Sequence, residues 1–256
     1  MALGIKITDN RYKFPGVGGA SIQGSSHHSR CQDAVLLNFQ TGFFAVADGA
    51  DRYPGTAVTV LMAFDSLFLC WKYNEFSNEE IDECSRNVME KIRCESTQLL
   101  SLLKGRVGST LTGLKLMASR EGPWGVILHT GDSDLYEYLP AAGVIRRITR
   151  NNFWMVGRTD HLFQLDRFQF TDQSILLWVT DGITIMNRKF SSDFPHTSRS
   201  CCNAAAVEDI PEKLLSIQAS VGQINDDAAV MALTPSRIVP SKQKIILGYE
   251  DAGVVF

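Results

Sequence analysis

The stretch that decides the fold is Phe43–Gly49, which reads FFAVADG in the printed sequence. Its five apolar residues have the length of a buried strand, and the Asp-Gly pair that follows is typical of a turn. A second apolar run, Ala34–Phe39, precedes it, and Gln40–Gly42 between the two runs predicts a β-hairpin. Asp33 opens the first strand of this hairpin and Asp48 closes the second. The hairpin therefore carries an acidic residue at the end of each strand.

Strand-forming and helix-forming segments occur in blocks along the rest of the chain. Helices are expected over Thr56–Trp71, Ser77–Lys104 and Pro211–Val221. Further strands are expected over Ser21–Ser25, Thr110–Met117, Trp124–Thr130, Leu135–Leu139, Val144–Thr149, Leu162–Phe170, Ser174–Thr180, Ala228–Leu233 and Lys244–Leu247. Because strands in runs and helices in runs indicate antiparallel sheets rather than alternating βαβ units, we predict an α+β fold.

The length and composition are those of one globular domain. The chain has 256 residues, 45% of them apolar and 21% charged, and it contains no repeat and no Gly/Ser-rich linker. We expect a single domain over residues 1–256, with a core of about 21–233 and a C-terminal extension over 234–256. The tryptophans are expected to anchor the core: Trp71, Trp124, Trp154 and Trp178.

Charge and patterning exclude several classes of protein. The formal net charge, 25 − 28 = −3, disfavours nucleic acid and anionic membranes as partners. The apolar stretch Val58–Trp71 is too short to span a bilayer, and the N-terminus lacks the apolar core of a signal peptide. None of the six cysteines forms a C-x-x-C pair. Reduced thiols and a cytoplasmic location are therefore expected.

The most informative residues are aspartates at the ends of predicted strands. One Asp-Gly pair after a strand is usually only a turn. Several carboxylates at one sheet edge repel each other unless a cation lies among them. Hard ions such as Mg²⁺ and Mn²⁺ prefer carboxylate oxygens, so this pattern predicts an oxygen-ligated metal site. The aspartates are Asp33, Asp48, Asp132, Asp181 and Asp226.

These segments resemble the motifs of the metal-dependent protein phosphatases, the type 2C serine/threonine phosphatases, and especially their bacterial branch with some sporulation-type features. Each motif alone is weak, but they occur in the family's order over most of the chain. The matching segments are Gln32–Ala34, Phe44–Gly49, Gly108–Thr110, Gly131–Ser133, Thr180–Ile183 and Asp226–Val230.

The resemblance implies a four-layer α-β-β-α sandwich of two antiparallel sheets flanked by helix pairs, with two Mn²⁺ or Mg²⁺ ions at one end. Carried over position by position, Asp48 would bridge both ions and Gly49 would offer its carbonyl to one of them. Asp181 and Asp226 would hold the other ion. The implied activity is hydrolysis of phosphoserine or phosphothreonine in proteins by a water that the two metals activate.

Two further aspartates have implied roles. Asp33 would act through a metal-bound water, which makes Asp33 and Asp48 the catalytic candidates. Asp132 would lie near a weak third metal. Ile185 occupies a position where the family often has an acid, which weakens that third site. The implied partners are a phosphorylated protein substrate and a cognate kinase or regulatory protein.

The chain departs from the family pattern at two positions that matter for catalysis. Ala50 replaces the histidine that some members use as a general acid. His28 replaces the usual phosphate-binding arginine, and Arg30 lies beside it, so His28 and Arg30 are the substrate-binding candidates.

Three functions remain open on the sequence. The first is an active phosphatase, favoured because every core metal position is intact. The second is a catalytically weak or inactive phosphoprotein-binding regulatory domain on the same fold, suggested by the two departures from the pattern. The third is a metal-dependent nuclease, which the negative net charge disfavours.

Overall fold

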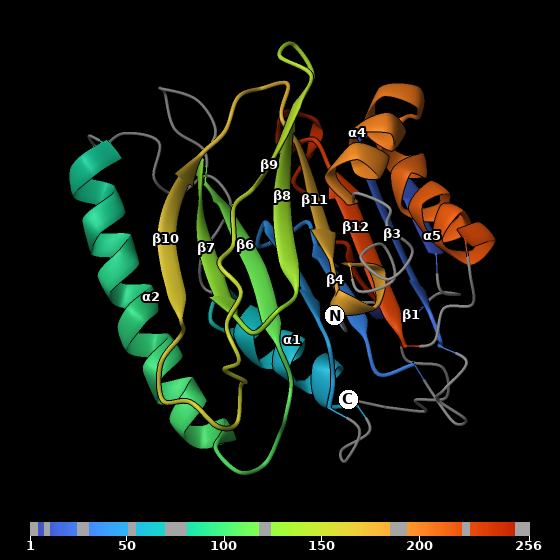
Figure 1. Ribbon diagram of the computed structural model, residues 1–256. Helices are drawn as coiled ribbons and strands as arrows, with labels where there is room; N and C mark the ends of the chain where they lie inside the picture. Colours follow the sequence, from blue (N-terminus) through green and yellow to red (C-terminus); the bar gives the residue numbers. More distant parts are fainter. Residues whose placement is uncertain are drawn as a thin grey trace.

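The computed structural model describes residues 5–7, 11–24, 31–50, 55–69, 81–117, 124–184, 194–221 and 226–248. Two β-sheets lie face to face, and helices cover the outer face of each (Figure 1). The strands pair antiparallel throughout these ranges, with one exception: β1 runs parallel to β13.

The first sheet has seven strands and the second has six. In spatial order the first contains β1 (Ile5–Ile7), β13 (Lys244–Leu247), β4 (Ala34–Asn38), β5 (Phe43–Ala47), β6 (Leu111–Met117), β7 (Trp124–Thr130) and β10 (Gln164–Gln169). The second contains β2 (Arg11–Phe14), β3 (Val17–Ile22), β12 (Ala228–Leu233), β11 (Ile175–Val179), β8 (Asp134–Leu139) and β9 (Val144–Arg147).

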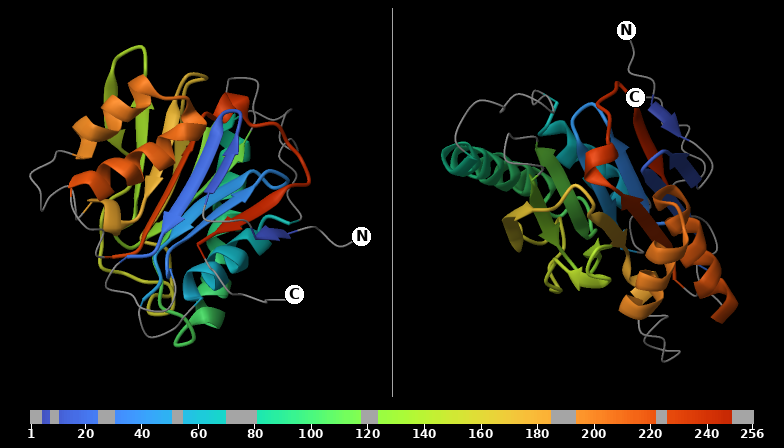
Figure 2. Two further views of the ribbon diagram at one scale, coloured as in Figure 1. Left: turned by 90° about the vertical axis from the view of Figure 1, so that its right-hand side faces the viewer. Right: turned by 90° about the horizontal axis from the view of Figure 1, so that it is seen from above.

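The helices form the two outer layers. They are α1 (Thr56–Ser66), α2 (Ile81–Leu103), α4 (Phe194–Ala204) and α5 (Ile210–Val221). Helix α1 packs on β4 and β5 and α2 on β10, whereas α5 packs on β3 and β12 and α4 on β9. The view from above in Figure 2 shows α2 on one side of the paired sheets and α4 and α5 on the other. This arrangement confirms the α+β, four-layer sandwich.

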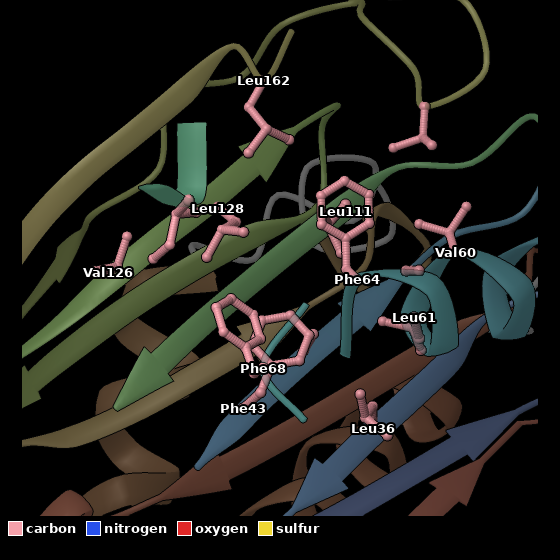
Figure 3. Packing of buried hydrophobic residues seen from close by; sticks show 14 of the residues in the cluster. Leu36, Phe43, Val60, Leu61, Phe64, Phe68, Leu111, Val126, Leu128 and Leu162 are labelled. Carbon is pink, nitrogen blue, oxygen red and sulfur yellow. The ribbon is translucent and has the colours of Figure 1, made fainter. Parts of the chain in front are cut away.

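Every residue of the hairpin strands except Asn38 is apolar, because both faces of these strands are buried. Along β5, Phe43 and Ala45 face the α1 layer, while Phe44 and Val46 face the second sheet. Figure 3 shows Phe43 against Phe68, which follows the end of α1 by two residues, and their ring centroids are 4.9 Å apart. The hairpin therefore joins the outer core under the helices to the inner core between the sheets.

Several boundaries differ from the predicted ones. Helix α1 ends at Ser66, because Leu67 and Phe68 bond to carbonyls three residues back and tighten the last turn. Strand β3 begins at Val17, four residues before the predicted strand. Strand β2 was not predicted, because its exposed edge position leaves it mostly polar. The predicted extension supplies β13, which lies inside the first sheet; the single-domain organisation stays a prediction.

The tryptophans divide into two groups. Trp124 and Trp178 are buried, as predicted. Trp154 is 38% exposed, so its assignment to the core was wrong: it lies on a surface loop. Trp71 lies outside the described residues. Among the helices in the described ranges, none combines the length and apolarity needed to cross a membrane.

A buried ion pair ties β13 to α1. The Asp65 carboxylate is fully buried and lies 2.6 Å from Lys244 Nζ. Its other oxygen accepts hydrogen bonds from Asn38 Nδ2 at 2.7 Å and from Thr41 Oγ1 at 3.2 Å. One carboxylate thus connects a helix, the hairpin turn and the C-terminal strand.

We expect Lys244→Met to lower the free energy of unfolding by about 3 kcal/mol, because it leaves the Asp65 charge buried without its cation. Urea denaturation measures the change. Lys242→Met, at an exposed position two residues away, is the matched control and should shift the value by less than about 0.5 kcal/mol. Equal effects of the two substitutions would show that the pair contributes no stability.

Candidate metal centre

Three aspartates from both sheets meet at one end of the sandwich. Asp48 directly follows β5, Asp132 follows β7 by two residues, and Asp181 follows β11 by two residues. One carboxylate oxygen from each lies within 4.8 Å of the others, and all three side chains are half-buried. We call these three residues the aspartate cluster. It unites three of the aspartates that the sequence placed at strand ends.

Hydroxyl side chains fix the backbone of Asp48. Ser109 Oγ donates to Asp48 O at 2.7 Å, and Thr110 N donates to the same oxygen at 2.9 Å. Asp48 N donates to Thr110 Oγ1 at 2.9 Å, and that hydroxyl also lies 2.8 Å from Ser133 Oγ. Thr110 therefore links the Asp48 turn directly to the loop that carries Asp132.

A buried histidine and asparagine support the Asp132 loop. Gly131 has φ +113°, and its N–H donates to Asn152 Oδ1 at 2.9 Å. His129 Nε2 lies 3.0 Å from the carbonyl of Arg150, so Nε2 carries the proton. Nδ1 lies 2.9 Å from the Thr112 hydroxyl, which also lies 3.0 Å from the carbonyl of Ser133. Burial lowers the pKa of His129 to about 4, which keeps the ring neutral.

Asp33 lies behind Asp48 rather than in the cluster. It is almost fully buried, and it hydrogen-bonds to Thr180 and to the Asp48 carboxylate. Burial, followed by the charge of Asp48, holds the pKa of Asp33 well above its usual range. A protonated Asp33 can donate to Asp48 and so orient it.

Electrostatic repulsion within the aspartate cluster favours the binding of a cation. Burial and then the neighbouring carboxylates raise the pKa of Asp48 well above its usual range. The same causes raise the pKa of Asp181 to about 6, with Asp132 as the largest charge contribution and Asp226 next. A divalent ion would relieve this repulsion, and carboxylate oxygens are the ligands that Mg²⁺ and Mn²⁺ prefer. The donor set therefore fits the metals that the resemblance implied.

Asp226 and Asp227 differ sharply in their surroundings. Asp226 is exposed, lies outside the aspartate cluster, and accepts a hydrogen bond from Asp227 N at 2.9 Å. Asp227 is buried and accepts from Gly24 N at 2.7 Å and from Gln32 N. Asp227 therefore anchors the two ends of the segment between Gly24 and Gln32.

Two glycines beside cluster residues allow close backbone approach. A Cβ on Gly49 would lie 2.8 Å from Gln32 O, and one on Gly182 would overlap Asp227 O. Any larger residue would separate these turns from the neighbouring strand. Gly49 also forms an isolated bridge with Ser109.

Not every predicted site residue can be placed. His28, Arg30 and Ile185 lie outside the described residues. Ala50 is held by a hydrogen bond from its N–H to Gly108 O at 2.8 Å. Sequence reasoning missed His129 and Asn152, because a single histidine within a strand and a single asparagine in a loop match no motif.

Solved structures resemble this architecture closely. The serine/threonine phosphatase PstP/Ppp of Mycobacterium tuberculosis superposes with a TM-score of 0.65 at 14% identity, over 84% of this chain and 96% of that one. This chain has the fold of the PPM serine/threonine phosphatases. The PstP catalytic domain in complex with two manganese ions gives a TM-score of 0.64 at 14% identity, over 90% and 97% of the two chains.

A further match of this phosphatase fold is PppA of Pseudomonas aeruginosa, described as a key regulatory component of T6SS. Its TM-score is 0.62 at 17% identity, over 91% of this chain and 97% of that one. A scan against protein-family models found no match, and a search of curated proteins found none either. The likeness therefore establishes the PPM fold, and function has to be argued from the site.

We expect a fall in pH to lower the free energy of unfolding through His129, because protonation of this ring is unfavourable in the folded state. Its folded pKa of about 4 lies below the ordinary value of 6.5, so its contribution is complete above pH 6.5 and is lost as the pH falls toward 4. Between about pH 7.5 and about pH 4.5, the metal-free wild type should lose about 2.5 kcal/mol more unfolding free energy than His129→Gln. Asp33, Asp48 and Asp181 have raised pKa values, so their contribution to the unfolding free energy increases as the pH falls. This contribution is the same in both proteins and cancels in the difference between them. Parallel curves for the two proteins would contradict a neutral, buried His129.

Asp227→Ala should lower the unfolding free energy by about 3 kcal/mol, because two backbone N–H groups lose a charged acceptor. Asp227→Asn keeps one acceptor oxygen and should cost about half as much. Urea unfolding in EDTA measures both, with Asp226→Ala as the exposed neighbouring control. A similar loss for Asp226→Ala would contradict the anchoring role.

Proposed function

We propose that this chain is a metal-dependent phosphatase that hydrolyses phosphoserine or phosphothreonine in proteins. The observation that carries the proposal is the aspartate cluster, which lies on the PPM fold and whose carboxylates repel one another without a cation. Divalent ions, when bound, would lower the pKa of a coordinated water and would offset the negative charge on the phosphoryl oxygens.

The proposed metal ligands come from the ends of strands in both sheets. Asp48 and Asp181 face one another across the two sheets and, with the Gly49 carbonyl and Asp226, make up the proposed ligand set for two Mn²⁺ or Mg²⁺ ions. The raised pKa of Asp181 is consistent with the charge of Asp226 reaching the cluster from its exposed position.

The remaining acidic residues have supporting roles in the proposal. Asp33 orients Asp48 by donating a hydrogen bond to it and is proposed to hold a water that enters the site. Asp132 is the proposed ligand of a third, weaker ion. His28 and Arg30 are proposed to bind the substrate phosphate, and they come from the segment whose two ends Asp227 anchors.

The substrate and partners follow from this activity. We propose a phosphorylated protein as substrate, with a cognate kinase or a regulatory protein as partner, acting in the cytoplasm. The regulatory role described for PppA supports such a setting for this fold. The second candidate, a phosphoprotein-binding regulator without turnover, is favoured by Ala50, which offers no proton to a leaving group.

We expect hydrolysis of p-nitrophenyl phosphate with Mn²⁺ or Mg²⁺ and none in EDTA. Asp48→Ala and Asp181→Ala should each reduce kcat/KM by at least about a hundredfold, because each removes a ligand from the proposed metal site. Asp172→Ala, at an exposed aspartate outside the aspartate cluster, is the matched control and should retain activity.

Circular dichroism and thermal melting would check that the variants fold. If the metal-loaded wild type hydrolysed no more substrate than Asp48→Ala did, the phosphatase proposal would fail. Binding of a phosphothreonine peptide by that inactive protein would then support the regulatory alternative.

A further inference from the structure

The segment between β9 and β10 displays a group of aromatic side chains on the surface. Phe153 is fully exposed, Phe163 is 40% exposed, and Trp154 is 38% exposed. The Trp154 ring meets Phe163 edge-to-face at 5.4 Å and His161 at 4.7 Å. We call these four residues the aromatic loop. A single exposed apolar residue is common on protein surfaces, but several exposed rings grouped together are typical of a binding surface.

The aromatic loop is attached firmly to the rest of the fold. Gly105, just after α2, donates to Gly157 O at 2.9 Å, and Lys104 Nζ lies 2.7 Å from Asp160. Leu162 is buried in the core beneath α2. Figure 1 shows this segment, in yellow, passing the C-terminal end of α2. The segment that carries the rings is therefore held against the fold, which lowers the entropic cost of binding.

The aromatic loop is connected to the aspartate cluster by a short path. Trp154 N donates to Asn152 Oδ1 at 3.0 Å, and that same oxygen accepts from Gly131 N, the residue before Asp132. The Cα atoms of Trp154 and Asp132 are thus at most about 16 Å apart. An extended peptide advances about 3.3 Å per residue, so about five residues cover that distance.

The surface around the rings is hollowed and carries a positive charge. One hollow of about 330 Å³ is lined by Phe153, Trp154, Arg158 and His161. A second, of about 360 Å³, shares His161 and extends over Phe163 to α2. Among the described residues no carboxylate lies within ion-pair distance of Arg158, whereas Asp160 is paired with Lys104. A peptide with an apolar residue beside an acidic one would complement this surface, because the apolar side chain can pack on the rings and the carboxylate can pair with Arg158.

We propose that the aromatic loop is the docking site for the protein substrate itself, and that it selects an apolar and an acidic residue within about five residues of the phosphoresidue. This inference rests on the proposed phosphatase function and adds its sequence preference. Nucleic acid also stacks on aromatic rings, but it fits less well, because the chain has a formal net charge of −3 and a polyanion needs many cationic contacts, whereas one acidic side chain needs only Arg158.

The test uses phosphothreonine peptides that differ only in their flanks. One set carries Phe and Glu within five residues of the phosphothreonine, a second carries Ala at those positions, and a third carries Phe and Lys. The wild type should turn over the Phe/Glu set with about tenfold higher kcat/KM than the Ala set. In the double variant Phe153→Ala/Trp154→Ala this preference should disappear. Its kcat/KM for the Phe/Glu peptides, divided by its kcat/KM for p-nitrophenyl phosphate, should therefore be about tenfold lower than in the wild type.

Two further variants complete the experiment. Arg158→Glu should favour the Phe/Lys set over the Phe/Glu set. Phe14→Ala, which removes a 42% exposed ring on β2, at the opposite edge of the second sheet from β9, is the matched control and should keep the wild-type preference. Fluorescence anisotropy of the labelled peptides gives dissociation constants without any turnover.

The outcomes separate the two proposals. Equal kcat/KM and equal dissociation constants for the three peptide sets would overturn the docking proposal while leaving hydrolysis of p-nitrophenyl phosphate intact. A preference that survives Phe153→Ala/Trp154→Ala would overturn it too. Absent turnover, together with flank-dependent binding that the double variant abolishes, would support docking and refute the phosphatase proposal.

Discussion

Mutual repulsion among carboxylates is the constraint on which the rest of this structure depends. Asp48, Asp132 and Asp181 come from three strands of two different sheets, and each would move away from the others in an unconstrained chain. They remain together because both sheets are pinned by cores on each side, so the strand ends cannot separate without loss of packing. Burial of apolar surface thus holds a charge arrangement that is unfavourable without a cation.

Packing of the sheets places the strand ends only approximately, and hydrogen bonds between the loops give the site its defined geometry. Thr110 connects the Asp48 turn to the Asp132 loop, and Asn152 connects that loop to the segment carrying Trp154. These contacts involve backbone N–H groups or buried hydroxyls, and hydrogen bonds in such a low-dielectric setting are strong. The same set of bonds therefore places both the acidic residues and the exposed rings, although these features serve different parts of a substrate.

The sequence predicted most of the strands and the α+β class because apolar runs such as Phe43–Ala47 indicate buried strands directly, whereas the four layers came from the family resemblance. It predicted a shared metal site for five aspartates at strand ends, and the structure brings three of them into one cluster. It could not predict the support from His129, because neutrality of that ring depends on neighbours distant in sequence. Trp154 was assigned to the core on residue type alone, and only the loop's tertiary contacts decide that it faces water.

The place of β13 in the first sheet has a consequence for how this chain is made. Strand β4 pairs with β5 on one side, but its other partner, β13, is separated from it by about two hundred residues. During synthesis the apolar edge of β4 stays open until Lys244–Leu247 leaves the ribosome, and β1 has no partner strand until then either. Pairing between segments so distant in sequence slows folding in general, and here it leaves a strand edge of β4 open for pairing with other chains until β13 has been synthesised.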